Sequence, residues 1–149
     1  MKLEDEIKQK KFRNEYHKLA VNLIFTNGWF IGLQNQIINR FDITSVQFNI
    51  LRILRGQHPK PASINMLKER MLDKMSDVSR LVDRLLSKKL VDRKICPKDR
   101  RKAEVLITDK GMNLLSEIDK LESEFDSVFK NISEDEAEII NALMDKMRG

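Results

Sequence analysis

The sequence predicts a mainly α fold of the α+β kind, in which a helix-turn-helix precedes one β-hairpin and helices flank both. Two observations carry this prediction. Apolar residues recur every three or four positions along most of the 149-residue chain, which is the helical period. The pattern changes to an alternation of period two at 91–95, and a returning strand is predicted at 104–107.

The first half of the chain shows three helical patterns. One long helix is predicted near the start, from the spacing of its apolar residues: Ile7, Phe12, Tyr16, Leu19, Leu23, Phe30 and Leu33. Thr44 and Gln47 then have the form of a capping box and predict the start of a second helix. Ser63 is a candidate N-cap for a short helix over 64–71.

The segment 73–88 is the most informative of the predicted helices. Asp73 is a candidate cap for its start. One arc of the helix is apolar: Met75, Val78, Leu81, Val82, Leu85 and Leu86. The opposite face is polar: Ser76, Ser79, Arg80, Asp83, Arg84 and Ser87. We therefore expect one side to face the core and the other to face solvent or a partner.

A β-hairpin and two helices complete the chain. The hairpin carries a basic tip at 97–102. Thr108 is predicted to cap a long helix with a heptad seam: Leu114, Ile118, Leu121, Phe125, Val128 and Ile132. Ser133 and Glu136 form another capping box, before a last helix with four residues expected to face inward: Ala137, Ile140, Met144 and Met147. Because a lone helix cannot bury such a seam, another helix or a second subunit must cover it.

Charge divides the chain into three regions. Residues 1–39 carry a net charge of +2. Residues 40–110 have 18 Lys and Arg against 9 Asp and Glu, a net +9. Residues 111–149 carry −6. A basic middle region favours a polyanionic partner, and ordinary solvated helix faces are the alternative.

Composition argues against several classes of protein. The single cysteine, Cys96, excludes an internal disulfide framework and a cysteine-based zinc cluster. His17 and His58 have no acidic partner at metal-binding spacing, and neither glycine-rich phosphate-binding motif occurs. No apolar run approaches the length of a membrane span, and the charged N-terminus lacks a signal-peptide pattern. No paired base and nucleophile is visible either, so we do not expect an enzyme. Together with the missing metal-binding and phosphate-binding patterns, this leads us to expect no metal and no cofactor.

A helix-turn-helix followed by a hairpin is an arrangement that binds DNA. The major groove admits an α-helix, and the guanidinium groups of Arg80 and Arg84 have the geometry to bind guanine or phosphate oxygens. A thin hairpin carrying Lys98, Arg100 and Arg101 suits a narrow minor groove, where negative potential is concentrated. Solvated surface residues are the alternative for both clusters, and the clean apolar arc opposite the two arginines favours DNA.

The runs ITSVQFNILRIL and SRLVDRLLSKKLVDRKICPKDRRKAEVLITDKG resemble the MarR family of multiple-antibiotic-resistance regulators, over about 40–112. The resemblance implies a winged-helix homodimer of the bacterial cytoplasm that binds pseudo-palindromic operator DNA, usually as a repressor. It implies recognition-helix roles for five residues: Ser76, Asp77, Ser79, Arg80 and Arg84. It implies wing roles for five more: Lys98, Asp99, Arg100, Arg101 and Lys102. Arg93 would brace the base of the wing or touch the DNA backbone.

The chain departs from the family pattern at two positions. Lys89 stands where a glycine usually precedes the LVxR strand, which implies modest strain if the backbone there is left-handed. Cys96 stands where an acidic residue is common, and we interpret it as an ordinary strand residue, with a redox switch as the alternative.

The family often binds small aromatic or phenolic effectors between the dimer helices and the DNA-binding lobe. Four residues are candidates for such a cleft, with ordinary core packing as the alternative: Tyr16, His17, Trp29 and Phe30. We therefore expect a sequence-specific transcription regulator, a ligand-responsive repressor that binds DNA as a homodimer. The alternative is a winged-helix protein-interaction module without sequence-specific DNA binding.

Overall fold

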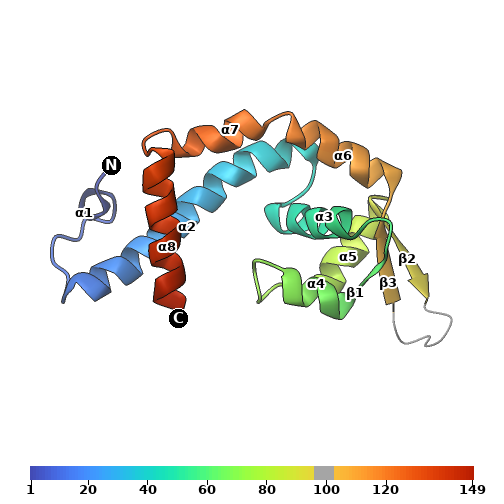
Figure 1. Ribbon diagram of the computed structural model, residues 1–149, viewed down its shortest axis with the longest axis horizontal. Helices are drawn as coiled ribbons and strands as arrows, with labels where there is room; N and C mark the ends of the chain where they lie inside the picture. The colour runs from blue at the N-terminus through green and yellow to red at the C-terminus, as the bar shows by residue number, and fades with distance from the viewer. Residues whose placement is uncertain (96–102) are drawn as a thin grey trace.

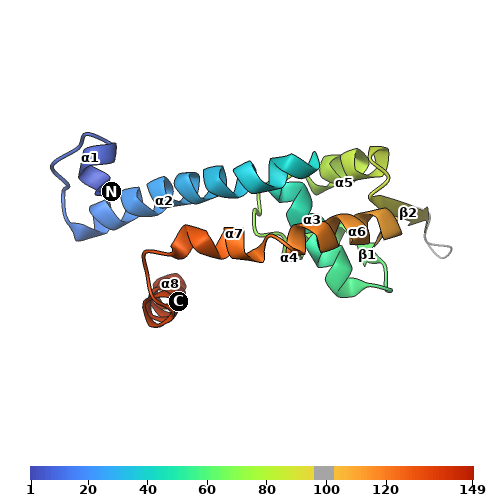
Figure 2. The ribbon, with the colours of Figure 1, turned by 90° about the horizontal axis from the view of Figure 1, so that it is seen from above.

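The computed structural model describes residues 1–95 and 103–149, which form an elongated molecule (Figure 1). Helix α2 (Glu15–Ile38) runs along most of its length, and the short 3-10 helix η1 (Asn39–Phe41) joins it to a lobe of helices and strands. The N-terminus lies near the end of α2 that is remote from the lobe, and helix α8 (Glu134–Arg148) with the C-terminus lies in the same half of the molecule, away from the lobe (Figures 1 and 2). The predicted mainly α fold with one small sheet is confirmed.

The N-terminal helix begins later than its apolar pattern predicts. Helix α2 starts at Glu15, after Asn14, whose side chain accepts a hydrogen bond from the backbone N–H of His17 at 2.9 Å. Before it, a single turn is helical, α1 (Leu3–Glu6), and Lys8 has a φ of 53°, which a right-handed helix does not accommodate. The predicted helical path over 7–14 is therefore wrong, because a left-handed residue and an asparagine cap interrupt it.

Two capped helices begin the lobe. Helix α3 (Ser45–Gln57) starts at the predicted capping box, in which Thr44 and Gln47 each accept a hydrogen bond from the other's backbone N–H. Helix α4 (Ile64–Arg70) starts at the predicted cap, because the Ser63 hydroxyl accepts from the third N–H of the helix at 3.1 Å. Both starts are set locally by short polar side chains.

Helix α5 (Val78–Ser87) begins later than predicted. Its cap is Asp77 and not Asp73: the Asp77 carboxylate accepts from the backbone N–H of Arg80 at 3.2 Å. Met75 was predicted to lie on the apolar arc, but it lies in the turn before the helix and is 93% exposed. The rest of the arc is confirmed by its buried residues: Val78, Val82 and Leu85.

A Schellman motif ends α5 and leads the chain into the hairpin. The N–H of Leu90 bonds to the carbonyl of Leu85, and the N–H of Lys89 bonds to the carbonyl of Leu86. Lys89 has a φ of 59°, the left-handed conformation that glycine adopts without a steric cost. The left-handed position inferred from the missing glycine is therefore confirmed.

Three antiparallel strands form the sheet of the lobe, in the order β1-β3-β2. Strands β2 (Val91–Ile95) and β3 (Ala103–Ile107) form the predicted hairpin, with Val91 opposite Ile107. Strand β1 (Ala62–Ser63) pairs with the other edge of β3 and was not predicted. A strand of two residues is too short to show an alternation in sequence.

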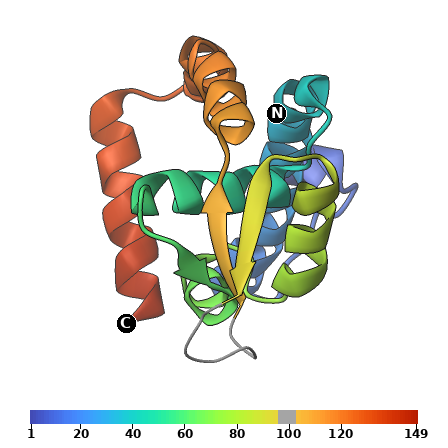
Figure 3. The same cartoon turned by 90° about the vertical axis from the view of Figure 1, so that its right-hand side faces the viewer.

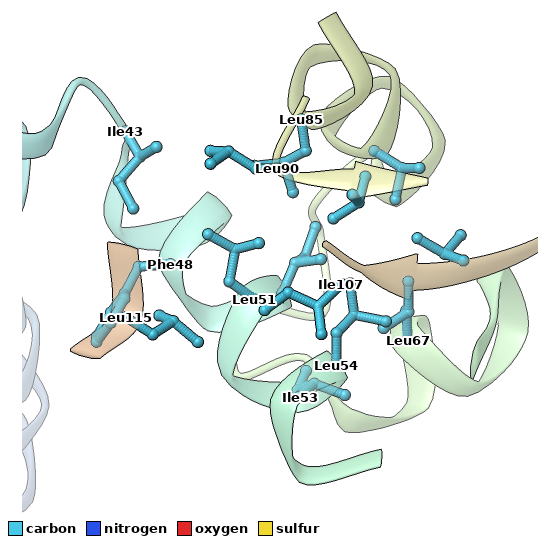
Figure 4. Packing of buried hydrophobic residues seen from close by; sticks show 14 of the residues in the cluster. Ile43, Phe48, Leu51, Ile53, Leu54, Leu67, Leu85, Leu90, Ile107 and Leu115 are labelled. Carbon is cyan, nitrogen blue, oxygen red and sulfur yellow. The ribbon is translucent and has the colours of Figure 1, made fainter. Parts of the chain in front are cut away.

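One hydrophobic core holds the lobe together (Figure 4). Residues of α3, α4, α5, the hairpin and α6 meet there, and the largest include Ile50, Leu51, Leu54, Leu67, Leu85 and Leu115. Each of these side chains is no more than 1% exposed, and burial of a large aliphatic side chain contributes about 1.5–3 kcal/mol. This core fixes the outer face of α5 relative to the hairpin.

The continuous helix predicted over 109–132 is broken. Helix α6 (Asp109–Asp119) starts at the predicted Thr108 cap, and α7 (Glu122–Asp126) follows after a short turn. The buried stripe of α6 shares Ile118 with the predicted heptad seam, but it contains the fully buried Leu115 where the seam has Leu114, which is half-buried. The side chain of Leu115 therefore packs in the lobe core, and α6 ends at Asp119 instead of continuing to 132.

Helix α8 follows the 3-10 turn η2 (Ser127–Phe129) and starts at the predicted capping box of Ser133 and Glu136. No residue of α8 is buried against the rest of the described chain, and Figure 2 shows this helix standing apart from α2. The inward orientation predicted for these four residues is wrong within a single chain, because Ala137 is only half-buried and Ile140, Met144 and Met147 are exposed. Among the described residues, no helix is long and apolar enough to cross a membrane.

Candidate nucleic-acid interface

The outer face of α5 presents the polar residues that the helical pattern predicts. Ser79, Arg80, Asp83 and Arg84 are all exposed on the side opposite the core. Within the described part of the chain, no carboxylate forms an ion pair with Arg80 or Arg84. Figure 3 shows α5 lying beside the β2–β3 hairpin. Two guanidinium groups are thus open to an anionic ligand next to the hairpin.

Two ion pairs fix the position of α5. Arg93 Nη2 on β2 lies 3.2 Å from Asp83 Oδ1, so the base of the hairpin is tied to the helix, which agrees with the predicted bracing role. At the C-terminal end, Lys88 Nζ donates to the carboxylate and to the main-chain carbonyl of Asp42, each at 2.5 Å. The Lys88 ammonium holds the pKa of Asp42 below its ordinary value, by hydrogen bonding first and by its charge second.

Asp73 shapes the turn that precedes α5. Its carboxylate accepts from the Ser76 hydroxyl at 2.7 Å and from the backbone N–H of Met75 at 2.9 Å, and these two bonds lower the pKa of Asp73. Ser76 therefore lies in the turn and not on the helix face, contrary to the prediction. The carboxylate of Asp77 is engaged as the helix cap.

A cleft of about 600 Å³ separates α2 from the start of α3 and the α4–α5 turn. Its apolar lining comes from Phe30, Ile31, Val46, Met71 and Leu72. Its polar lining comes from Asn27, Gln34, Ser45, Asn49 and Asp73. A hydrogen bond of 3.0 Å from the backbone N–H of Leu72 to Asn49 Oδ1 ties the turn to α3.

The lobe that carries this surface matches a known family of regulators. Residues 41–102 match the MarR family model. Over 114 residues the chain is 27% identical to the HTH-type transcriptional regulator MhqR of Bacillus subtilis, covering 76% of this chain and 77% of that protein. A mutant MarR from E. coli complexed with operator DNA is similar with a TM-score of 0.81 and 26% identity, covering 93% of this chain and 99% of that chain.

The chain is similar to the MarR family over residues 41–102, and its fold matches that of MarR over most of its length. It is a DNA-binding transcription regulator with a winged helix-turn-helix fold. A further similar structure is that of Bordetella bronchiseptica BpsR, whose DNA binding is regulated by 6-hydroxynicotinic acid. That structure has a TM-score of 0.78 and 26% identity, covering 89% of this chain and 99% of that chain.

In this regulator, α4 and α5 form the helix-turn-helix and the β2–β3 hairpin forms the wing. The described strands reach Ile95 and Ala103. The five predicted wing residues lie outside the described residues, as does Cys96: Lys98, Asp99, Arg100, Arg101 and Lys102. Their roles stay predictions.

The four residues predicted to line an effector cleft do not come together. Tyr16 and His17 lie near the start of α2, about 20 Å along the helix from Trp29 and Phe30. Tyr16 is 82% exposed, and His17 Nδ1 accepts a hydrogen bond from the backbone N–H of Arg13 at 3.2 Å. Of the four, Phe30 lines the cleft, so the predicted grouping is wrong.

Sequence reasoning missed the polar residues of this cleft. Gln34, Asn49 and Asp73 come from α2, α3 and the α4–α5 turn, and no shared motif links them. Asp73 did stand out in the sequence, but as a helix cap, since an aspartate before a helical pattern is typical of both caps and turns. Only the packing of α2 against the lobe brings the three together.

Proposed function

We propose that this chain is a MarR-family regulator, which binds pseudo-palindromic operator DNA as a homodimer and represses transcription until a small effector binds. The observation that carries the proposal is the exposed face of α5, where Arg80 and Arg84 lie without a carboxylate partner among the described residues. One such face fits one major groove, and two faces related by a twofold axis fit two half-sites. Because operator DNA lies in the bacterial cytoplasm, we expect the protein to act there.

The proposal of a homodimer is supported by apolar residues that are exposed on helices outside the lobe. Helix α8 keeps several large apolar residues exposed, including Ile140 at 39% and Leu143 at 60%, and α2 keeps Ile24 exposed at 76%. A second copy is the partner that would bury such surfaces in a symmetric protein. We therefore assign 1–39 and 111–149 to dimerisation and 40–110 to DNA binding, within one intertwined domain.

Selection from a random DNA pool tests the DNA-binding proposal. We expect enrichment of a pseudo-palindrome with half-sites about one helical turn apart, bound less tightly as salt rises. Arg80→Ala and Arg84→Ala should each weaken binding by about 1–3 kcal/mol. Lys120→Ala is the control, since this lysine forms only an exposed pair with Glu117 on α6 and should leave the affinity unchanged.

The opposite result would identify a different function. The protein would not recognise an operator if it bound DNA weakly and without sequence preference, and if neither arginine substitution changed its affinity. Such a result would favour a winged helix that binds another protein.

The effector site that we propose is the cleft between α2, α3 and the α4–α5 turn. It is lined on one side by Phe30 and on another by the turn that leads into α5, so a bound molecule would contact both the long helix and the DNA-binding lobe. Differential contacts of this kind are what a ligand needs to shift an equilibrium between two conformations. Phe30→Ala should abolish release of operator DNA by an effector while leaving the affinity for DNA unchanged, as measured by fluorescence anisotropy of labelled DNA.

A further inference from the structure

The polar groups of the effector cleft have an unusual charge balance. Three amides and one hydroxyl line it, together with one carboxylate, that of Asp73. None of the described lining residues is Lys, Arg or His. An organic anion in this cleft would therefore meet no cationic partner, and it would lie near a like charge.

The carboxylate of Asp73 is ionised and fixed in place. It accepts from the Ser76 hydroxyl at 2.7 Å and from the Met75 backbone N–H at 2.9 Å, and both bonds favour the charged form. The neighbouring ammonium of Lys74 is directed elsewhere, since it donates to the main-chain carbonyl of Glu69 at 2.5 Å and does not line the cleft. The negative charge of Asp73 thus faces the cleft without a basic side chain beside it there.

Asp73 also keeps the capacity to bind a further donor. A carboxylate offers about four lone-pair sites, and the structure gives this one two donors. The apolar side of the cleft, with Phe30 and Val46 among its residues, suits a flat ring. The cleft thus combines an apolar wall with a single anionic group.

Resting on the proposed function of the cleft, we propose that it selects a small aromatic cation over an aromatic anion, with Asp73 as the residue that binds the cationic group. The ligand class is an amine or amidinium attached to an aromatic ring. A cation bound there contacts Asp73, whose carboxylate is hydrogen-bonded to Ser76. Ser76 immediately precedes Asp77, the cap of α5, so the bound cation lies against the turn that leads into this helix.

Three probes of nearly equal shape test this proposal: benzamidine, which is cationic, benzamide, which is neutral, and benzoate, which is anionic. Binding at neutral pH is measured by titration calorimetry and by the fluorescence of Trp29, the single tryptophan, which adjoins Phe30 in sequence. We expect benzamidine to bind at least tenfold more tightly than benzoate, with benzamide between them.

Asp73→Asn keeps one oxygen that can accept from the Met75 backbone N–H, and its NH2 group can donate to the Ser76 hydroxyl. Because the variant removes the charge, it should bring benzamidine and benzamide to equal affinity. Asp92→Asn on β2 is the matched control, because it removes the same charge from an exposed carboxylate that does not line the cleft. This control variant should keep the preference for benzamidine.

Two results would overturn the proposal: benzoate binding as tightly as benzamidine, or no probe binding at millimolar concentration. A preference for benzamidine that persists in Asp73→Asn would overturn the role of Asp73. Operator binding, measured on the same samples without probe, separates this inference from the proposed function. A protein that binds operator but prefers benzoate refutes the ligand class alone, and one that selects benzamidine but binds no operator refutes the DNA-binding proposal alone.

Discussion

Arg55 on α3 and Asp119 on α6 form a two-bond ion pair, with Nη1–Oδ2 at 2.6 Å and Nη2–Oδ1 at 3.2 Å. The rings of Phe48 and Phe125 lie nearly parallel, with centroids 6.4 Å apart, and they join α3 to α7. These contacts attach the C-terminal helices to the DNA-binding lobe. The lobe thus depends for its position on a region that we assign to dimerisation.

Arg55→Ala should lower the free energy of unfolding by about 1 kcal/mol. Both side chains are partly exposed, at 29% and 41%, so solvent screens the pair and the loss stays modest. Arg55→Lys should recover less than half of the loss, because an ammonium cannot donate the two parallel hydrogen bonds of a guanidinium. Urea denaturation at one fixed protein concentration measures both variants, and full recovery by lysine would show that the fork geometry is unimportant.

Lys89→Gly should stabilise the protein by about 1 kcal/mol. The residue has a φ of 59° in the Schellman motif after α5, and a side chain there costs about 1–2 kcal/mol that glycine avoids. Lys89→Ala is the control, because it removes the charge but keeps the Cβ, and it should leave stability nearly unchanged. Thermal unfolding followed by circular dichroism distinguishes the two, and equal gains from both would assign the effect to charge.

Gly111→Ala should destabilise the protein by about 2 kcal/mol or more. A Cβ at Gly111 would overlap the main-chain carbonyl oxygen of Leu90 and the side chain of Ile107, and the backbone atom cannot move aside cheaply. Gly56→Ala in α3 provides the comparison, since its Cβ would meet only Arg70 Nη2 at 3.9 Å. That change should be neutral or favourable because alanine is the better helix former. Urea denaturation of both variants measures the two changes in stability. A Gly111→Ala protein that unfolds at the same urea midpoint as wild type would contradict the steric argument.

The Asp42–Lys88 pair should make stability depend on pH in the acid range. Because the pKa of Asp42 is lowered in the folded protein, its contribution is present above the unfolded value of about 4 and is lost as pH falls through the folded value. Asp42→Asn should therefore be less stable than wild type at pH 7, and the difference should shrink as pH falls below about 4 and vanish once the carboxylate is protonated in the folded protein. Asparagine tolerates the φ of 55° at this position, so the comparison isolates the charge. A difference that persists at low pH would contradict the electrostatic account.

Local polar chemistry made the starts of four helices predictable. Thr44, Ser63, Thr108 and Ser133 all cap the helices expected of them, because a cap is a contact between residues three apart. The start of α5 was mispredicted because Asp73 and Asp77 are both plausible caps locally, and core packing of Val78 decides between them. A local sequence pattern therefore identifies the cap of a helix only where no second candidate residue lies nearby.

Features that depend on contacts between distant segments were not predictable from one sequence. Strand β1 exists because Ala62 pairs with Val105. The cleft needs α2, α3 and the α4–α5 turn to come together. No part of the chain that the structure describes buries the apolar face of α8, so the spacing of its apolar residues predicts burial without naming the surface that would provide it.

Leu143→Glu should convert the dimer that we propose into a monomer. Leu143 is 60% exposed within the single chain and lies on the same face of α8 as Ile140 and Met144. If a second copy covers this face, glutamate would place an unpaired carboxylate in an apolar interface. The dissociation constant of the dimer should then rise at least about 100-fold. Sedimentation velocity over a range of protein concentrations measures the effect.

Ala142→Glu is the matched control for this change. It adds the same charge to the same helix but on the opposite face, so the variant should remain a dimer. Leu143→Glu should also lose most of its affinity for the full pseudo-palindrome, because two half-sites are then bound independently, while its affinity for a single half-site should be unchanged. A Leu143→Glu protein that sediments like wild type would show that α8 lies outside the dimer interface, and the assignment of 111–149 to dimerisation would then fail for this helix.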